Sequence, residues 1–429
     1  MLPARLSTIA VVLGAMILPD FTALAGEAGE SSCPQLCDGW SVSLSGGPGF
    51  ILYGNAWFDS VRSSKLYPMA DLRVGRVLGP GSRSIFPKEY NYPTVGLGVS
   101  FNNLRAIHCT DPTHLDNMVD LYGFFERNII RRQHFSFGYD LIIGLGFTST
   151  KYDPFTNPKN ELISSPVVFD LGTGLFVNYN LTPRFEIGAA LHFKHHSAGK
   201  LAFPNCGVNE VLPTISARYR LGNAAQPARQ KHEQDGEHEE VAGLGELALK
   251  VSVGGGVNRC LTSWTVLNEM VEDPAQKALT IDAFPKEFAS FDLSYRYAPR
   301  FSSGLGLDLF CASGDYVDAM RKYEAVIVGS GNVAAHTYSP FSCGVSASQY
   351  FHYGNFAIHI GVGVYLWHRT GMLEDAGISY ERIGMSYSLP RLAGLTLSMN
   401  CKCHYFSSAE MMEFGIGIPV KSWKLKISD

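Results

Sequence analysis

The segment FEIGAALHFKHHS, residues 185–197, decides the fold, because its side chains alternate strictly between two kinds. The odd positions are apolar as far as Phe193, whereas the even positions hold all the charged and histidine side chains before His195, such as Lys194, together with a glycine and an alanine. Successive side chains of a strand point to opposite faces. One apolar and one polar face is typical of a membrane β-barrel, apolar toward lipid and polar toward the lumen. Because the alternation continues, we expect His195 and Ser197 at the lipid-facing end of this strand.

The composition fits a membrane barrel and excludes some partners. The chain has 429 residues, of which 44 are glycine, 12% are aromatic and 17% are charged. The charged fraction is below the roughly 25% of an average soluble domain. The formal net charge of -4 argues against a nucleic-acid partner.

The N-terminus has the pattern of a secretory signal peptide, residues 1–25. Arg5 supplies the positive charge, residues 9–18 form a short apolar core, and Ala-Leu-Ala at 23–25 offers a cleavage site. No later run reaches the roughly 20 apolar residues of a transmembrane helix. We therefore expect an exported chain, in which Cys33 and Cys37 are close enough in sequence to bridge.

Alternating segments recur along the whole chain and predict an all-β, antiparallel transmembrane barrel of about sixteen strands. The expected strands are 40–45, 71–76, 95–101, 119–127, 135–148, 167–181, 185–197 and 209–221, then 247–254, 288–297, 305–311, 341–350, 356–367, 380–387, 395–405 and 412–418. Between the two sets lies a charged run. The predicted domains are therefore a barrel half at 26–221, a polar periplasmic linker at 222–246 and a second half at 247–429. One wide barrel and two eight-stranded barrels both fit, and we favour one continuous barrel.

Connections of alternating length set the orientation. A tight turn at 180–183 contrasts with longer polar connections at 149–165 and 198–208. Short periplasmic turns and long outer loops are the pattern of outer-membrane barrels. A chain that starts in the periplasm would then bring His195 and Ser197 to the outer leaflet.

A histidine two residues before a serine on one strand face can activate the hydroxyl. The two Cα atoms are about 6.6 Å apart from the strand rise, and such a base needs a third group to orient it. The next strand offers Asn209, expected on the lipid face with the dyad, and Glu210, expected toward the lumen. A bulge at Pro213 would reverse that assignment. From periodicity alone, polar residues that merely meet lipid headgroups are the competing interpretation.

Several motifs carry a resemblance to a known family. HHSAG at 195–199 followed by PNCGVN at 204–209 resembles the signature of the lipid A 3-O-deacylase (PagL-like) outer-membrane family, in which a His-x-Ser-Asn segment precedes a Pro-Asn-x-Gly loop and an acidic residue. YDPFTNPKN at 152–160, and HYF at 404–406 with EFGIG at 413–417, resemble longer, two-part relatives labelled acyloxyacyl hydrolases. The resemblance covers most of the chain beyond the signal.

The resemblance implies a carboxylic ester hydrolase that acts on lipid A of lipopolysaccharide in the outer membrane of a Gram-negative bacterium. Ser197 would be the nucleophile and His195 its base, and the family's acid falls on Asn209, with Glu210 as the alternative third member. Ala198 replaces the asparagine that usually follows the nucleophile, so backbone N–H groups of Ala198 and Gly199 would stabilise the oxyanion. The reaction needs neither metal nor cofactor. A porin or other transport barrel, and a structural barrel that has lost activity, are the rival functions.

Overall fold

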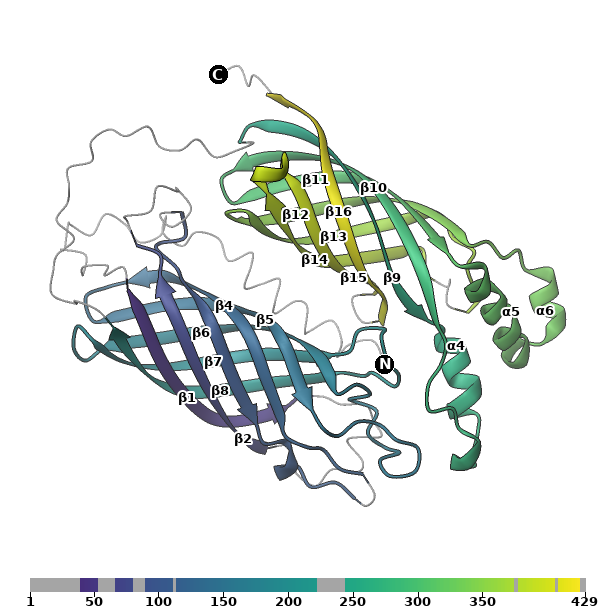
Figure 1. Ribbon diagram of the computed structural model, residues 1–429, viewed down its shortest axis with the longest axis horizontal. Helices are drawn as coiled ribbons and strands as arrows, with labels where there is room; N and C mark the ends of the chain where they lie inside the picture. Colours follow the sequence, from purple (N-terminus) through teal and green to yellow (C-terminus); the bar gives the residue numbers. More distant parts are fainter. Residues whose placement is uncertain are drawn as a thin grey trace. The chain divides into compact units, whose positions relative to one another are not determined.

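The computed structural model describes residues 39–52, 66–79, 89–110, 113–221, 244–373, 377–405 and 408–424. These residues form two closed antiparallel β-barrels (Figure 1). The predicted signal peptide, most of the predicted linker, and Cys33 and Cys37 lie outside the described residues.

The first barrel closes by pairing its first strand with its eighth. Its strands are β1 (Trp40–Ile51), β2 (Leu66–Val77), β3 (Thr94–Asn102), β4 (Met118–Arg131), β5 (Phe135–Thr148), β6 (Val167–Asn180), β7 (Phe185–Ser197) and β8 (Val208–Leu221). The predicted bounds of β5 and β7 are confirmed to the residue. β6 ends at Asn180, one residue before its predicted end. The remaining strands extend beyond their predicted cores, because glycine, proline and polar residues at their ends interrupt the hydrophobic pattern without breaking the ladder.

The second barrel closes separately, with β16 paired to β9. Its strands are β9 (Glu246–Arg259), β10 (Ala283–Ala298), β11 (Phe301–Ala312), β12 (Phe341–Tyr353), β13 (Phe356–Trp367), β14 (Ser379–Leu389), β15 (Leu395–His404) and β16 (Ser408–Lys424). The all-β class and the count of sixteen are confirmed for the described residues. The prediction of one continuous barrel is wrong. β8 pairs with β7 along one edge and with β1 along the other, so neither edge is available to pair with β9.

Short helices occupy some connections, and strand alternation does not predict them. They are the α-helices α4 (Leu261–Trp264), α5 (Gly314–Val328) and α6 (Ser330–Ala335), the π-helix η3 (Thr265–Glu269), and the 3-10 helices η2 (Leu104–Ala106), η4 (Pro274–Gln276) and η5 (Pro390–Leu392). The longest, α5, begins where the Ser313 hydroxyl accepts a hydrogen bond from the Tyr316 amide and ends at Gly329, whose φ is 88°. In the described part of the chain, no helix combines the length and hydrophobicity needed to cross a membrane.

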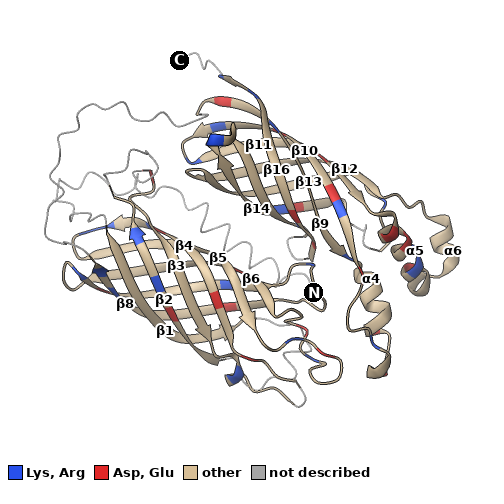
Figure 2. Ribbon diagram, viewed as in Figure 1, with Lys and Arg blue, Asp and Glu red and all other residues tan. Residues whose placement is uncertain are grey.

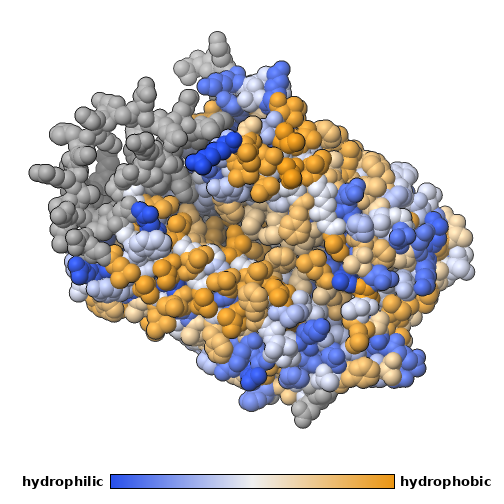
Figure 3. Space-filling view, in the orientation of Figure 1, coloured by the Kyte–Doolittle hydropathy of each residue, from blue (hydrophilic) through white to orange (hydrophobic). Residues whose placement is uncertain are grey.

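The outer surfaces of both barrels are apolar. Outward residues such as Leu97, Ile215 and Leu305 are 66%, 75% and 68% exposed, and hydrophobic atoms cover the visible strands while hydrophilic atoms gather on the loops (Figure 3). A soluble protein can expose single leucines, but a protein that exposed rows of apolar side chains on every strand would aggregate in water without lipid. The pattern is that of a membrane barrel.

The interiors are polar and filled by side chains. Charged residues interrupt the strands at few positions (Figure 2), and most of these positions point inward. In the first barrel the Lys194 ammonium lies 2.6 Å from a carboxylate oxygen of Asp120 and 2.7 Å from one of Asp170, all three side chains being buried. In the second barrel Arg382 lies 3.0 Å from Asp308 and 2.8 Å from Glu413. Each barrel therefore has its own network of compensated charges.

Removing Lys194 should destabilise the first barrel. Lys194→Met leaves Asp120 and Asp170 facing each other without their cation, which costs about 3–5 kcal/mol for a broken buried ion pair. Urea unfolding in lipid vesicles measures the loss. The exposed Lys151→Met is the matched control and should change the free energy of unfolding little. A Lys194→Met barrel as stable as the control would show that the network does not support the fold.

Candidate active site

The predicted site residues lie on the outward faces of β7 and β8. His195 pairs with Asn209 in the antiparallel register, and the ladder shows no shift between the two strands. His195, Ser197 and Asn209 are partly exposed, whereas the alternating neighbours His196 and Glu210 are buried in the lumen. No bulge forms at Pro213, so Glu210 stays on the face opposite to the dyad and does not contact His195 as its third group.

Asn209 holds the His195 ring. The distance from His195 Nδ1 to Asn209 Oδ1 is 2.8 Å. An amide oxygen only accepts hydrogen bonds, so this contact assigns the proton to Nδ1 and leaves Nε2 as the unprotonated nitrogen. That is the tautomer that a general base needs. An amide provides it without the negative charge that a carboxylate would place beside an imidazolium.

Asn205 contacts the serine, and the predicted site set does not include it. Its side-chain amide donates to Ser197 Oγ at 2.9 Å, and its amide oxygen accepts from the Ala198 N–H at 3.0 Å. The Ala198 N–H, predicted as an oxyanion donor, is thus engaged by Asn205. The Pro-Asn-x-Gly motif at 204–207 is the sequence feature that could have pointed to Asn205, but only the folded loop places this asparagine beside the Ser197 hydroxyl.

Gly207 shapes the loop that carries Asn205. Its φ is 72°, and a Cβ at this position would lie 2.9 Å from Cε1 of His195. Glycine therefore meets two needs, a left-handed backbone and room for the imidazole. The amides of Cys206 and Gly207 donate to the carbonyls of Glu161 and Leu162 at 3.0 and 3.2 Å. The loop before β8 is thereby anchored to the connection between β5 and β6.

The anchoring connection is itself ordered by Asn157. Its side chain donates to the His114 and Lys151 carbonyls at 3.0 and 3.1 Å and accepts from the His114 amide at 3.0 Å. Because Asn157 is buried, it joins two loops much as a backbone turn would. The segment 152–160, which carries part of the family resemblance, has a structural role next to the site.

Asp116 provides a second link between these loops. It accepts hydrogen bonds from Arg105 and Ser149. Burial raises the pKa of Asp116, but the hydrogen bonds from Arg105 and Ser149 outweigh it and lower that pKa to about 2. The carboxylate is therefore ionised at neutral pH and the link persists.

Directly behind the site, a charged cluster fills the lumen. His196 lies 3.1 Å from Glu210 and 3.0 Å from Asp120. Ligand atoms of Asp120, Asp170 and His196 come within 4.8 Å of one another, as in a metal site, a grouping that the sequence spacing does not reveal. The Lys194 ammonium already bridges the two aspartates, so the donor set is compensated by a side chain and fits a structural role better than a metal ion.

The second barrel repeats the inner pattern of the last two strands but not the outer one. Lys402 and His404 on β15 contact Glu410 on β16. On β7 and β8 the histidine of a Lys-x-His segment, His196, likewise contacts a glutamate, Glu210, whereas Lys194 binds Asp120 and Asp170. Cys403 and Tyr405 stand where His195 and Ser197 would stand in the same alternation. Among the described residues, only the first barrel has an outward His-x-Ser arrangement.

Comparisons with solved structures give only distant likenesses. The chain is similar to Neisserial surface protein A at 11% identity over 42% of this chain and 97% of that chain, with a TM-score of 0.27. It is similar to NanC porin at 8% identity over 89% of this chain and 99% of that chain, with a TM-score of 0.15. It is similar to a triple mutant of Rhodopseudomonas blastica porin at 7% identity over 90% of this chain and 100% of that chain, with a TM-score of 0.16. Scores this low carry no information about function.

The family comparison is more specific. No curated protein matches the chain. Residues 248–422 match the family described as acyloxyacyl hydrolase, C-terminal domain. The match lies on the second barrel, whereas His195, Ser197 and Asn209 lie on the first. It supports the assignment of this chain, through its second barrel, to a PagL-like family, and so confirms the family predicted from the motifs.

Proposed function

We propose that this protein is an outer-membrane ester hydrolase that removes an acyl chain from lipid A. The observation that carries the proposal is the outward His195, oriented through Nδ1 by Asn209, on the same strand face as Ser197. The match of residues 248–422 to an acyloxyacyl hydrolase domain supports the general class of reaction. The substrate and the roles of individual residues are part of the proposal.

The geometry supports a serine esterase mechanism. His195 Nε2 takes the proton of Ser197 Oγ while the oxygen attacks the ester carbonyl. The side-chain amide of Asn205, 2.9 Å from Ser197 Oγ, is placed to donate to the oxyanion of the tetrahedral intermediate. Collapse breaks the ester bond, and the imidazolium returns its proton to the departing sugar alkoxide. Water, deprotonated by His195, then attacks the acyl-enzyme, and the imidazolium returns that proton to Ser197 Oγ as the fatty acid leaves.

The position of the dyad supports a membrane substrate. In this proposal the chain starts in the periplasm, so β7 runs outward and ends at the outer leaflet, where the ester bonds of lipid A lie near the headgroup. The first domain, 26–221, would carry catalysis, and 222–246 would return the chain through the periplasm to the second domain, 247–429. A serine facing lipid can then attack lipopolysaccharide without extracting it from the bilayer.

The barrel interiors oppose the transport alternative. Eight strands leave an interior that side chains just fill. Between Arg73, His192 and Lys194 in the first barrel, the cavity has a volume of about 10 Å³, room for about one water molecule. Arg73 further crosses that space to Asp140 at 2.5 Å. The second rival, a barrel without turnover, is decided by the following experiments.

Expression in a Gram-negative host should remove one ester-linked hydroxyacyl chain from lipid A. Ser197→Ala and His195→Ala should each lower this activity by at least about 10³-fold, as expected when members of a catalytic unit are removed. Mass spectrometry of extracted lipid A is the measurement. Ser303→Ala on the outer face of β11 and His134→Ala at a β4–β5 turn are matched controls. Identical lipid A with and without the intact protein would contradict the proposal.

A carboxylate at position 209 should increase activity. Asn209→Asp or Asn209→Glu keeps an acceptor for Nδ1 and adds the charge that stabilises the imidazolium, so we expect kcat/KM to rise about tenfold or more. Asn180→Asp, at the end of β6 that lies far from Ser197 in the β6–β7 ladder, controls for the added negative charge. Assays with purified lipid A in mixed micelles provide the rates. Unchanged rates in both variants would mean that the missing charge does not limit the reaction.

Asn205→Ala should lower kcat without unfolding the barrel. Loss of one oxyanion donor typically costs about 10²–10³ in kcat. KM should change little, because the donor acts on charge that develops only in the transition state. The same micelle assay, with circular dichroism as a check of folding, provides the result. A variant with wild-type kcat would remove Asn205 from the mechanism.

A further inference from the structure

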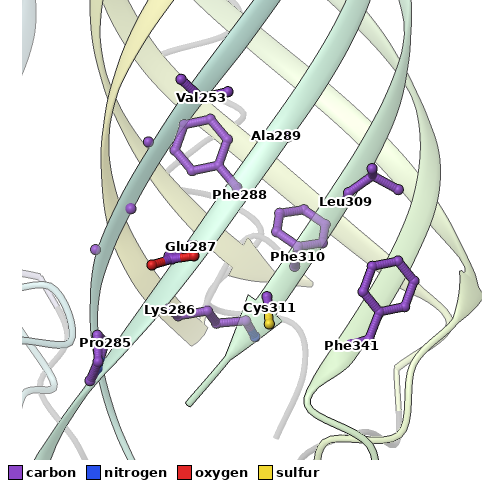
Figure 4. A pocket seen from close by; sticks show the side chains of 13 residues that line it. Val253, Pro285, Lys286, Glu287, Phe288, Ala289, Leu309, Phe310, Cys311 and Phe341 are labelled. Carbon is purple, nitrogen blue, oxygen red and sulfur yellow. The ribbon is translucent and has the colours of Figure 1, made fainter.

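A groove of about 630 Å³ lies on the second barrel, along β9 to β12. Val253, Leu309 and Phe341 project around it from three strands (Figure 4). These residues occupy outward positions, whereas Phe288 and Phe310 are buried on the inner side of the same wall. The groove therefore opens toward the lipid and not toward the lumen. Its volume is in the range of about 300–1,000 Å³ that small-molecule sites occupy.

Small side chains form the floor of the groove. Gly255, Glu287, Cys311 and Phe341 are aligned across four strands by the ladder registers. In the next row toward the barrel centre, Val253, Ala289 and Leu309 are aligned in the same way. Glycine and alanine between larger apolar side chains leave a trough in the barrel wall. Hydrocarbon from the surrounding bilayer is the material that such a trough accommodates.

Glu287 is the one charged residue among the outward-facing members of the lining, and it is exposed. The neighbouring Lys286 points inward and binds Glu410, so it does not compensate Glu287. Within the described part of the chain, no hydrogen bond or ion pair is found for the Glu287 carboxylate. A carboxylate on the lipid-facing side of a barrel has a cost unless it meets water or a cation.

The depth of Glu287 places it among headgroups. It precedes the exposed Tyr297 by about ten residues on β10, roughly 25 Å along the membrane normal for a tilted strand. That distance matches the height of the apolar band, whose borders are marked by aromatic residues. With Tyr297 at one border, Glu287 lies at the other, and the apolar trough lies on the side toward the membrane centre.

We propose that this groove binds a phospholipid with an amine headgroup, its acyl chain in the trough over Gly255 and Ala289 and its ammonium at Glu287. Charge selects the headgroup, because the one outward charge in the lining is negative and no outward basic residue lines the groove to attract an anionic lipid. The site is on the second barrel, whereas Ser197 belongs to the first, and it requires only that the second barrel lie in a bilayer. It is independent of the proposed hydrolase function.

Photolabelling of the full chain in vesicles tests the site. Two probes carry the same diazirine-bearing acyl chain, one on phosphatidylethanolamine and one on phosphatidylglycerol. Mass spectrometry should locate adducts on 253–257, 285–289 and 309–311, with about fivefold more from phosphatidylethanolamine, as one partly exposed ion pair supports. Glu287→Gln should abolish the headgroup preference while keeping the adducts.

Filling the trough should remove the adducts from both probes. Gly255→Leu does so from β9 and Ala289→Phe from β10, and Ala347→Leu on the outer face of β12 is the matched control. Ser197→Ala should label like the wild type, which separates this site from the hydrolase activity. Adducts spread evenly over the strands, equal labelling by the two probes, or full labelling of both filled variants in folded protein would each overturn the proposal.

Discussion

The unbroken register between β7 and β8 is the constraint on which the site depends. Because side chains alternate without a slip, the same two strands present His195 and Asn209 to the outside and His196 and Glu210 to the inside. A shift of one residue would exchange the two sets, burying the base and exposing charges to lipid. The lumenal contact between His196 on β7 and Glu210 on β8, at 3.1 Å, joins the same two strands and thus favours the register that the outer site requires.

Much of the architecture follows from local pattern. Alternation predicts the sixteen strands and places Asn209 outside and Glu210 inside, because burial on one face fixes which side chains face which way. Closure is different, since it depends on whether β8 pairs with β1 or continues into β9, and both pairings bring together segments far apart in the sequence. The position of Asn205 cannot be predicted from the sequence either. The loop 198–207 is held by backbone hydrogen bonds to Glu161 and Leu162, and backbone contacts between distant segments produce no pattern in residue spacing.

The two barrels share an inner design and differ on their outer walls. Both have a Lys-x-His segment and a glutamate in the lumen near the end of the ladder, which is consistent with a common structural requirement for compensated charge in a narrow barrel. Outside, the first barrel has His195 and Ser197, and the second has a glycine-lined groove with one carboxylate. Under the two proposals, the first barrel carries the reaction and the second barrel binds lipid.

The most direct test of the central claim is chemical trapping of the nucleophile. An amphiphilic fluorophosphonate, which forms a covalent bond with activated serines, should give one adduct per chain in the intact mass spectrum, and peptide mapping should place it on Ser197. The adduct should disappear in His195→Ala, because the base that activates the hydroxyl is gone. No adduct on the folded wild-type protein, or an adduct on another serine, would contradict the account.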